Sequence, residues 1–190
     1  MSKPVIVLGW GSLIWDPQEL KLKAQSEWQE DGPSLPIEFA RISSRDRLTL
    51  VRKMDAEHVP VLWHEMAPEL TLDEAVEDLR IREGCPSQEP IGFIDFGANE
   101  RRSRDAEFAV TITNWAEDKG IDKVIWTDLG VKFKGETGED FSPESAIDYL
   151  KGLEDDSNAK EYVEKAPRQI QTVVRNRIRE ELKWGNEPNP

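Results

Sequence analysis

The stretch that organises the chain is Val5-Ile6-Val7-Leu8-Gly9-Trp10-Gly11-Ser12-Leu13-Ile14-Trp15-Asp16-Pro17. Its apolar and β-branched start predicts a short buried strand over residues 4–8. Two glycines then flank Trp10, so the chain can bend sharply after the strand and bring its backbone close to a ligand. Successive amides in such a loop can form a concave anion-binding nest. The structural alternative is a tight turn in which Trp10 and Trp15 only anchor the core.

Composition and charge restrict the class of protein. The 190 residues include 37% hydrophobic and 33% charged residues, which is typical of one soluble unit with a heavily charged surface. The net charge of −13 argues against a nucleic-acid partner and against an anionic membrane surface. We expect a cytoplasmic protein, because no signal peptide or transmembrane stretch is visible and a single cysteine excludes an internal disulfide. With two histidines and that cysteine as the soft ligands, no structural zinc site is expected.

Apolar and polar residues alternate in several further segments. This alternation predicts strands over residues 37–42, 47–51, 59–66, 91–96, 107–115 and 123–129. Turn-forming residues separate most of these segments, and one helix interrupts them. The pattern favours an α+β fold with an antiparallel or mixed sheet that closes partly.

That helix has clear signals at both ends. Thr71 and Glu74 have the spacing of a capping box, and Gly84 follows as a C-terminal stop. Glu83 is therefore a carboxylate at a helix C-terminus, where the helix dipole disfavours a negative charge. A carboxylate in such a place is a candidate general acid or base. The structural alternative is a solvent-exposed glutamate at a helix end.

The chain changes character after residue 130. We expect residues 1–130 to form the sheet domain and residues 131–184 a helical extension packed on it within one compact unit. Ser142-Pro143 predicts a helix start, a short helix is expected over residues 159–165, and a long one from Pro167 to Trp184. The long helix carries a basic face that is either solvated and paired with acids or a site for a protein partner or self-association. Residues 185–190 are predicted to be a disordered tail.

Two motifs together resemble a known family. Val7-Leu8-Gly9-Trp10-Gly11-Ser12-Leu13-Ile14-Trp15-Asp16-Pro17 is similar to the N-terminal motif of the γ-glutamylcyclotransferase-like proteins, especially their ChaC-type branch. Val61-Leu62-Trp63 and Leu79-Arg80-Ile81-Arg82-Glu83-Gly84 follow in the family's order. The resemblance implies a mixed, barrel-like sheet with flanking helices, and no metal or cofactor. The segment from about residue 120 has no counterpart in the family.

The resemblance also implies a reaction and a site. In the family, the α-amine of a γ-glutamyl group attacks its own γ-carbonyl and releases 5-oxoproline with an amine or peptide. By the motif match, Glu83 is the general acid and base, and the loop residues Trp10, Gly11, Ser12 and Leu13 bind the small-molecule substrate. Trp10 departs from the family, which usually has tyrosine there, so no phenol hydroxyl is available.

Two other functions remain open from the residues alone. The first is a non-catalytic module that binds a small molecule or a protein on the same fold. The second is a thiol enzyme built on Cys85 and His64, for which no third catalytic group is visible.

Overall fold

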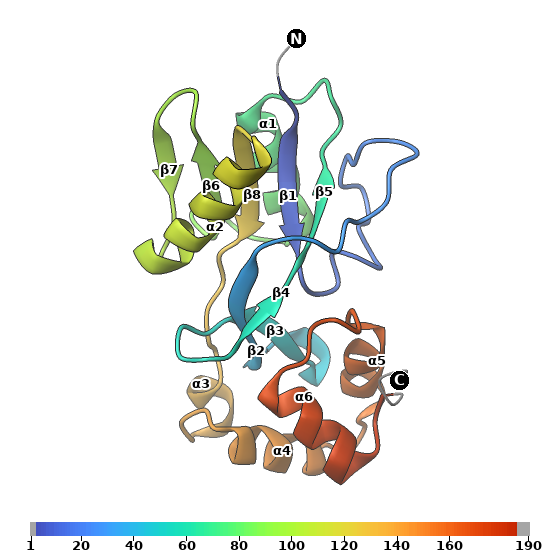
Figure 1. Ribbon diagram of the computed structural model, residues 1–190. Coiled ribbons are helices and arrows are strands. Elements are labelled where there is room, and N and C mark those ends of the chain that lie inside the picture. Colours follow the sequence, from blue (N-terminus) through green and yellow to red (C-terminus); the bar gives the residue numbers. More distant parts are fainter. Residues whose placement is uncertain (1–2, 186–190) are drawn as a thin grey trace. The chain divides into compact units, whose positions relative to one another are not determined.

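The apolar residues near the start of the chain form β1 (Val5–Gly9), which confirms the first predicted strand. All five are buried, as expected for a strand that is covered on both faces. The computed structural model describes residues 3–185, and β1 lies inside a five-stranded sheet with the order β5-β1-β8-β6-β7 (Figure 1). β1 runs parallel to β8, and the other neighbours pair antiparallel. The remaining strands are β5 (Leu62–Glu65), β6 (Ile91–Asp95), β7 (Glu100–Arg102) and β8 (Lys123–Thr127).

Two helices cover the two faces of this sheet. α1 (Leu72–Arg82) lies behind it and α2 (Ala106–Lys119) in front of it in Figure 1. The face toward α1 contributes Val5, Val7 and Ile125 to a buried cluster with the apolar side of that helix. Neighbouring residues of a strand point to opposite faces. Trp126 accordingly lies on the other face, where its ring is 6.4 Å from that of Phe108 in α2.

α1 confirms the helix predicted from its ends. The side chain of Thr71 accepts from the Glu74 N–H, and the Glu74 side chain accepts from the Thr71 N–H, which completes the capping box. The helix ends at Arg82, and Glu83 is its C-cap. Gly84 follows with a φ of +64°, a conformation that favours glycine.

The strand predicted over residues 107–115 is wrong, because this segment lies within α2. The segment is rich in β-branched residues, and its alternation also fits a strand. The structure instead buries Phe108, Ala109, Ile112 and Ala116, the spacing of one helical face. Asp105 accepts from the N–H groups of the first turn and so provides the N-cap.

A second, three-stranded sheet has the order β3-β2-β4. Its strands are β2 (Ser34–Ile42), β3 (Leu48–Arg52) and β4 (His58–Pro60), with a short 3₁₀ turn at Ser44–Asp46 between β2 and β3. The predicted mixture of helices and strands is thus confirmed. The described strands form two sheets and close no barrel, so the barrel-like sheet that was expected is not seen within residues 3–185.

The chain divides into two compact units. One contains the chain up to Leu35 together with Pro60–Leu129, and the other contains Pro36–Val59 together with the chain from Gly130. The segment 36–59 therefore groups with the C-terminal helices, whereas the division expected from the sequence placed it in the first domain. The helices of the second unit are α3 (Lys134–Thr137), α4 (Pro143–Lys151), α5 (Ser157–Lys165) and α6 (Val173–Arg177), which continues as a π-helical turn (Ile178–Leu182).

The long helix predicted from Pro167 to Trp184 is wrong in its first part. α6 begins only at Val173, because Thr172 caps its N-terminus. The preceding turn wraps around the buried guanidinium of Arg175, which donates to the carbonyls of residues 163, 166, 167 and 170. The guanidinium thus supplies donors to carbonyls at and beyond the end of α5, and the carbonyl of Pro167 also accepts from the Ile170 N–H. Of the predicted tail, residues 186–190 lie outside the described residues.

The basic face expected on this last helix is largely paired within the chain. Arg175 is buried, Arg177 pairs with Glu144 and Glu181, and Arg179 donates to Gln171. Arg177 thus fits the alternative of a solvated face that pairs with acids, whereas Arg175 departs from it, because it is buried and bonds to backbone carbonyls. No helix within residues 3–185 combines the length and the apolar character that crossing a bilayer requires.

Candidate functional site

The loop after β1 folds into two overlapping turns. The Ile14 N–H donates to the Gly11 carbonyl at 3.1 Å, and the Asp16 N–H donates to the Ser12 carbonyl at 2.8 Å. The N–H groups of Gly11, Ser12 and Leu13 donate to no acceptor within the described residues. Gly11 and Leu13 are buried, and buried backbone donors normally have a partner. These three amides are therefore the candidate ligand-binding groups of the loop.

Gly9 is required where the strand meets the loop. A Cβ there would lie 2.7 Å from Cζ3 of Trp28 and 3.1 Å from Cγ1 of Ile14. The close approach predicted for this glycine therefore exists, but its partner is an indole ring of the same chain rather than a ligand.

The side chain of Trp10 fills the core rather than facing the loop amides. It is 6% exposed, and its ring lies edge-on to that of Phe108 at 6.3 Å, on the face that α2 covers. Leu13 is 4% exposed and belongs instead to the cluster on the α1 face. The loop is thus anchored on both faces of the sheet. This position corresponds to the alternative in which Trp10 anchors the core and does not contact a ligand.

Glu83 lies at the junction that the sequence predicts, and it is not a solvent-exposed residue. As the C-cap of α1, its N–H donates to the carbonyls of Leu79 and Ile81. Its side chain is 16% exposed, and Oε1 lies 2.5 Å from Nη1 of Arg82. The guanidinium compensates the unfavourable position of a carboxylate at a helix C-terminus.

Arg82 connects this carboxylate to the loop. Its Nη2 donates to Oγ of Ser12 at 3.1 Å and to the carbonyl of Asp16 at 2.7 Å, while Nη1 donates to Glu83. One guanidinium thus contacts both predicted motifs, although Ser12 and Arg82 are 70 residues apart in the chain. Sequence reasoning missed Arg82. Its signal was an arginine directly before the candidate glutamate.

A second set of contacts holds the turn that follows α1. Arg80 donates to both carboxylate oxygens of Glu77 and to the carbonyl of Cys85, and Gln88 also donates to Glu77. The hydrogen bonds from Arg80 and Gln88 lower the pKa of Glu77 to about 2. These contacts stabilise the chain just beyond Glu83.

Cys85 and His64, the candidates for a thiol enzyme, are both buried and contact groups of the protein core. Cys85 is 7% exposed, and its N–H donates to the Arg80 carbonyl. His64 is 3% exposed, and its ring packs against Trp28 at 5.4 Å. Its Nδ1 lies 2.7 Å from the carbonyl oxygen of Glu65, so this nitrogen carries the proton of that hydrogen bond.

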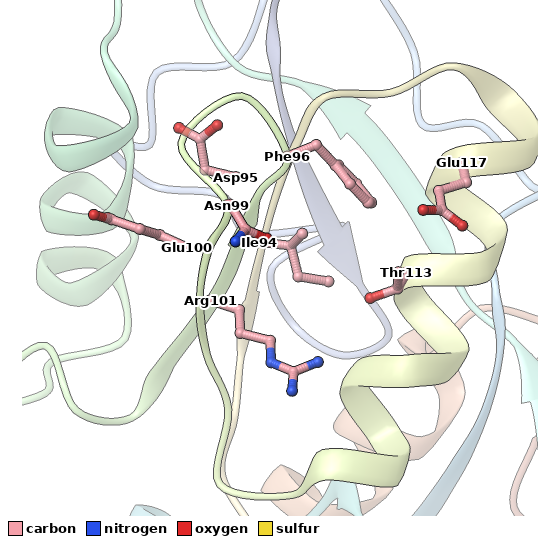
Figure 2. Close-up of a pocket in the computed structure, with 8 residues that line it drawn as sticks. All are labelled: Ile94, Asp95, Phe96, Asn99, Glu100, Arg101, Thr113 and Glu117. Carbon is pink, nitrogen blue, oxygen red and sulfur yellow. The ribbon is translucent and has the colours of Figure 1, made fainter.

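A separate cavity lies between the β6–β7 hairpin and α2 (Figure 2). Its volume is about 470 Å³, and sequence reasoning did not find it. Arg101 of β7 and Glu117 of α2 provide opposite charges on two of its sides, and Phe96 adds an aromatic ring to the lining (Figure 2). The other lining residues are Ile94, Asp95, Asn99, Glu100 and Thr113. The lining offers charge and an apolar surface, but no cysteine, histidine or paired hydroxyl nucleophile.

Comparison of the chain with protein-family models, with curated proteins and with solved structures found no match.

Proposed function

We propose that this chain is a γ-glutamylcyclotransferase-like enzyme of the cytoplasm that releases 5-oxoproline from a γ-glutamyl amide or peptide. The observation that supports the proposal is the contact of one buried guanidinium, that of Arg82, with both Ser12 and Glu83. The two motifs of the family resemblance are thus neighbours in space. The guanidinium contacts a carboxylate on one motif and, on the other, a loop whose amides at Gly11, Ser12 and Leu13 have no acceptor among residues 3–185.

The reaction balances by proton transfers alone. The substrate's α-ammonium loses a proton to the carboxylate of Glu83, and the free amine attacks the γ-carbonyl carbon. A new C–N bond closes the five-membered ring, and the bond to the leaving nitrogen breaks. Glu83 returns its proton to the leaving nitrogen. It then takes the second proton that the ring nitrogen must lose to become an amide and passes it to the same amine, which departs as an ammonium ion. One carboxylate thus serves as base and as acid. The proposal therefore includes no metal and no cofactor.

The loop has a separate task in this mechanism. The N–H groups of Gly11, Ser12 and Leu13 hold the α-carboxylate of the substrate, because fixed backbone donors bind an anion without a mobile charge. This matters in a protein with a net charge of −13, which repels anions at long range. Holding the substrate folded back on itself supplies much of the rate, since ring closure depends on the orientation of the reacting atoms. Trp10 takes part only by anchoring the loop.

The second candidate is a non-catalytic binding module on the same fold. The ion pair favours it, because Oε1 of Glu83 already has a cationic partner at 2.5 Å, as in a structural bridge. The cavity of Figure 2, which is lined by residues outside both motifs, would then be the binding site.

The deciding experiment measures 5-oxoproline formed from γ-glutamyl dipeptides, glutathione and γ-glutamyl amines. We expect turnover of at least one substrate by the wild type and a loss of about 100-fold or more in Glu83→Gln, which cannot exchange the proton. Glu77→Gln is the matched control, because it removes the partner of another arginine on the same helix. It should keep activity within a few-fold.

Two results would contradict the proposal. A Glu83→Gln variant with wild-type turnover would exclude this carboxylate from the mechanism. A folded wild type that forms no 5-oxoproline from any substrate would exclude the reaction itself and favour the binding module.

A further inference from the structure

Arg82 is more deeply buried than a residue at a helix end requires. Its side chain is 6% exposed, and Nε is buried without a hydrogen-bond partner within the described residues. Burying a cation is costly unless its partners compensate the loss of water. The partners present are the carboxylate of Glu83, the hydroxyl of Ser12 and the carbonyl of Asp16. The groups that compensate the desolvated charge at Nη1 and Nη2 thus all belong to the two motifs.

The shape of the guanidinium makes this bridge rigid. Its nitrogens lie in one plane with fixed directions for their hydrogens. Both hydrogens of Nη2 have an acceptor in the loop, one in Ser12 and one in Asp16. With Nη2 held in this way, the direction of Nη1 is also determined, and Nη1 donates to the carboxylate of Glu83.

We infer that Arg82 is a positioning residue that fixes the Glu83 carboxylate relative to the amides of Gly11, Ser12 and Leu13. The inference deepens the proposed function and rests on it for its catalytic consequence. A proton acceptor that must meet a substrate amine has to lie at a set distance from the group that holds the substrate's carboxylate. A displacement of about 1 Å can cost about 100-fold in rate.

Lysine would not replace this arginine. Its single nitrogen carries the same charge, but it lacks the planar fork that reaches the loop and the carboxylate at once. Arg82→Lys therefore separates positioning from charge. Arg82→Gln removes both, and Arg82→Ala leaves a space into which added guanidinium can bind.

The control is Arg80, which lies two residues before Arg82 in α1 and on another side of the helix. It also pairs with a glutamate of the same helix, but its contacts are to Glu77 and Cys85 and not to the loop. Arg80→Lys and Arg80→Gln therefore match the change in charge and helix propensity while leaving the bridge in place.

The first measurement is steady-state kinetics on the substrate that the wild type turns over fastest. We expect kcat to fall about 10- to 100-fold in both Arg82→Lys and Arg82→Gln, and to stay within about threefold in the Arg80 variants. Millimolar guanidinium should restore part of kcat in Arg82→Ala and leave that of the wild type unchanged. An Arg82→Lys variant with the kcat of the wild type would overturn the inference.

The second measurement needs no activity and follows hydrogen exchange at the loop amides. The N–H groups of Ile14 and Asp16 are the probes, because each has an acceptor within the loop. We expect both to exchange at least about 10-fold faster in the Arg82 variants, since the loop loses its contact with α1. Unchanged exchange there would overturn the inference. If the wild type proves inactive, the proposed function fails, and hydrogen exchange alone decides whether Arg82 holds the loop.

Discussion

Truncation of Trp10 tests whether this tryptophan anchors the loop or contacts the substrate. Trp10→Ala removes an indole that is 94% buried and packed edge-on against Phe108. Truncation of a buried aromatic residue to alanine costs about 3–5 kcal/mol, and the aromatic pair contributes about 0.5–1.5 kcal/mol of this. Trp10→Phe keeps a ring at the contact and loses less volume, so we expect a cost of about 1–2 kcal/mol.

Urea denaturation followed by far-ultraviolet circular dichroism measures these losses. The seven tryptophans make fluorescence a mixed probe, so exchange at the β1 amides should be followed alongside to report on the first unit. Ile81→Ala is the control, since this side chain is 59% exposed on α1 and its truncation should cost less than about 0.5 kcal/mol. The free energies of unfolding of the variants and the wild type are compared where the denaturant slope m is unchanged.

The two roles of Trp10 predict different results. If the indole is an anchor, Trp10→Phe keeps 5-oxoproline formation within a few-fold of the wild type. The free energy of unfolding then falls less in Trp10→Phe than in Trp10→Ala. A Trp10→Ala variant that loses less than about 1 kcal/mol while its KM rises at least 10-fold would refute the argument. The indole would then contact the substrate.

Two further substitutions test the packing and the electrostatics away from the loop. Gly92→Ala should cost at least about 1–3 kcal/mol by thermal denaturation, because its Cβ would lie 2.2 Å from Cε2 of the fully buried Trp126, whereas Gly135→Ala meets no atom within 4 Å and should cost little. Burial raises the pKa of Glu38 above its usual 4.5, so the stability this carboxyl contributes is present below that pH and is lost as the pH rises through the raised value. The urea midpoint of the wild type should therefore fall relative to that of Glu38→Gln from about pH 4.5 upward, and parallel pH profiles would show that Glu38 does not titrate in this way.

Features set by residues a few positions apart could be predicted from the sequence. The apolar run of β1, the capping box of Thr71 and Glu74, and the Ser142-Pro143 helix start all act through adjacent backbone groups. For the same reason, Glu83 could be placed at a helix end. Where local signals conflicted, the prediction failed. The β-branched residues of segment 107–115 favoured a strand, but the Asp105 cap and burial on one face made it a helix.

Only the tertiary structure decided which distant groups meet. Arg175 donates to four carbonyls in and just before the turn that stands where the helix from Pro167 was expected, and no local pattern contains that information. Trp10 could equally have faced a ligand or the core until α2 brought Phe108 against it. The sequence by itself determined that a glycine-rich loop follows the first strand and that a carboxylate ends a helix. Folding decided that Arg82 joins them. Glu83 is its neighbour in the chain, but Ser12 is 70 residues away, and only packing brings such a distant group within hydrogen-bond reach.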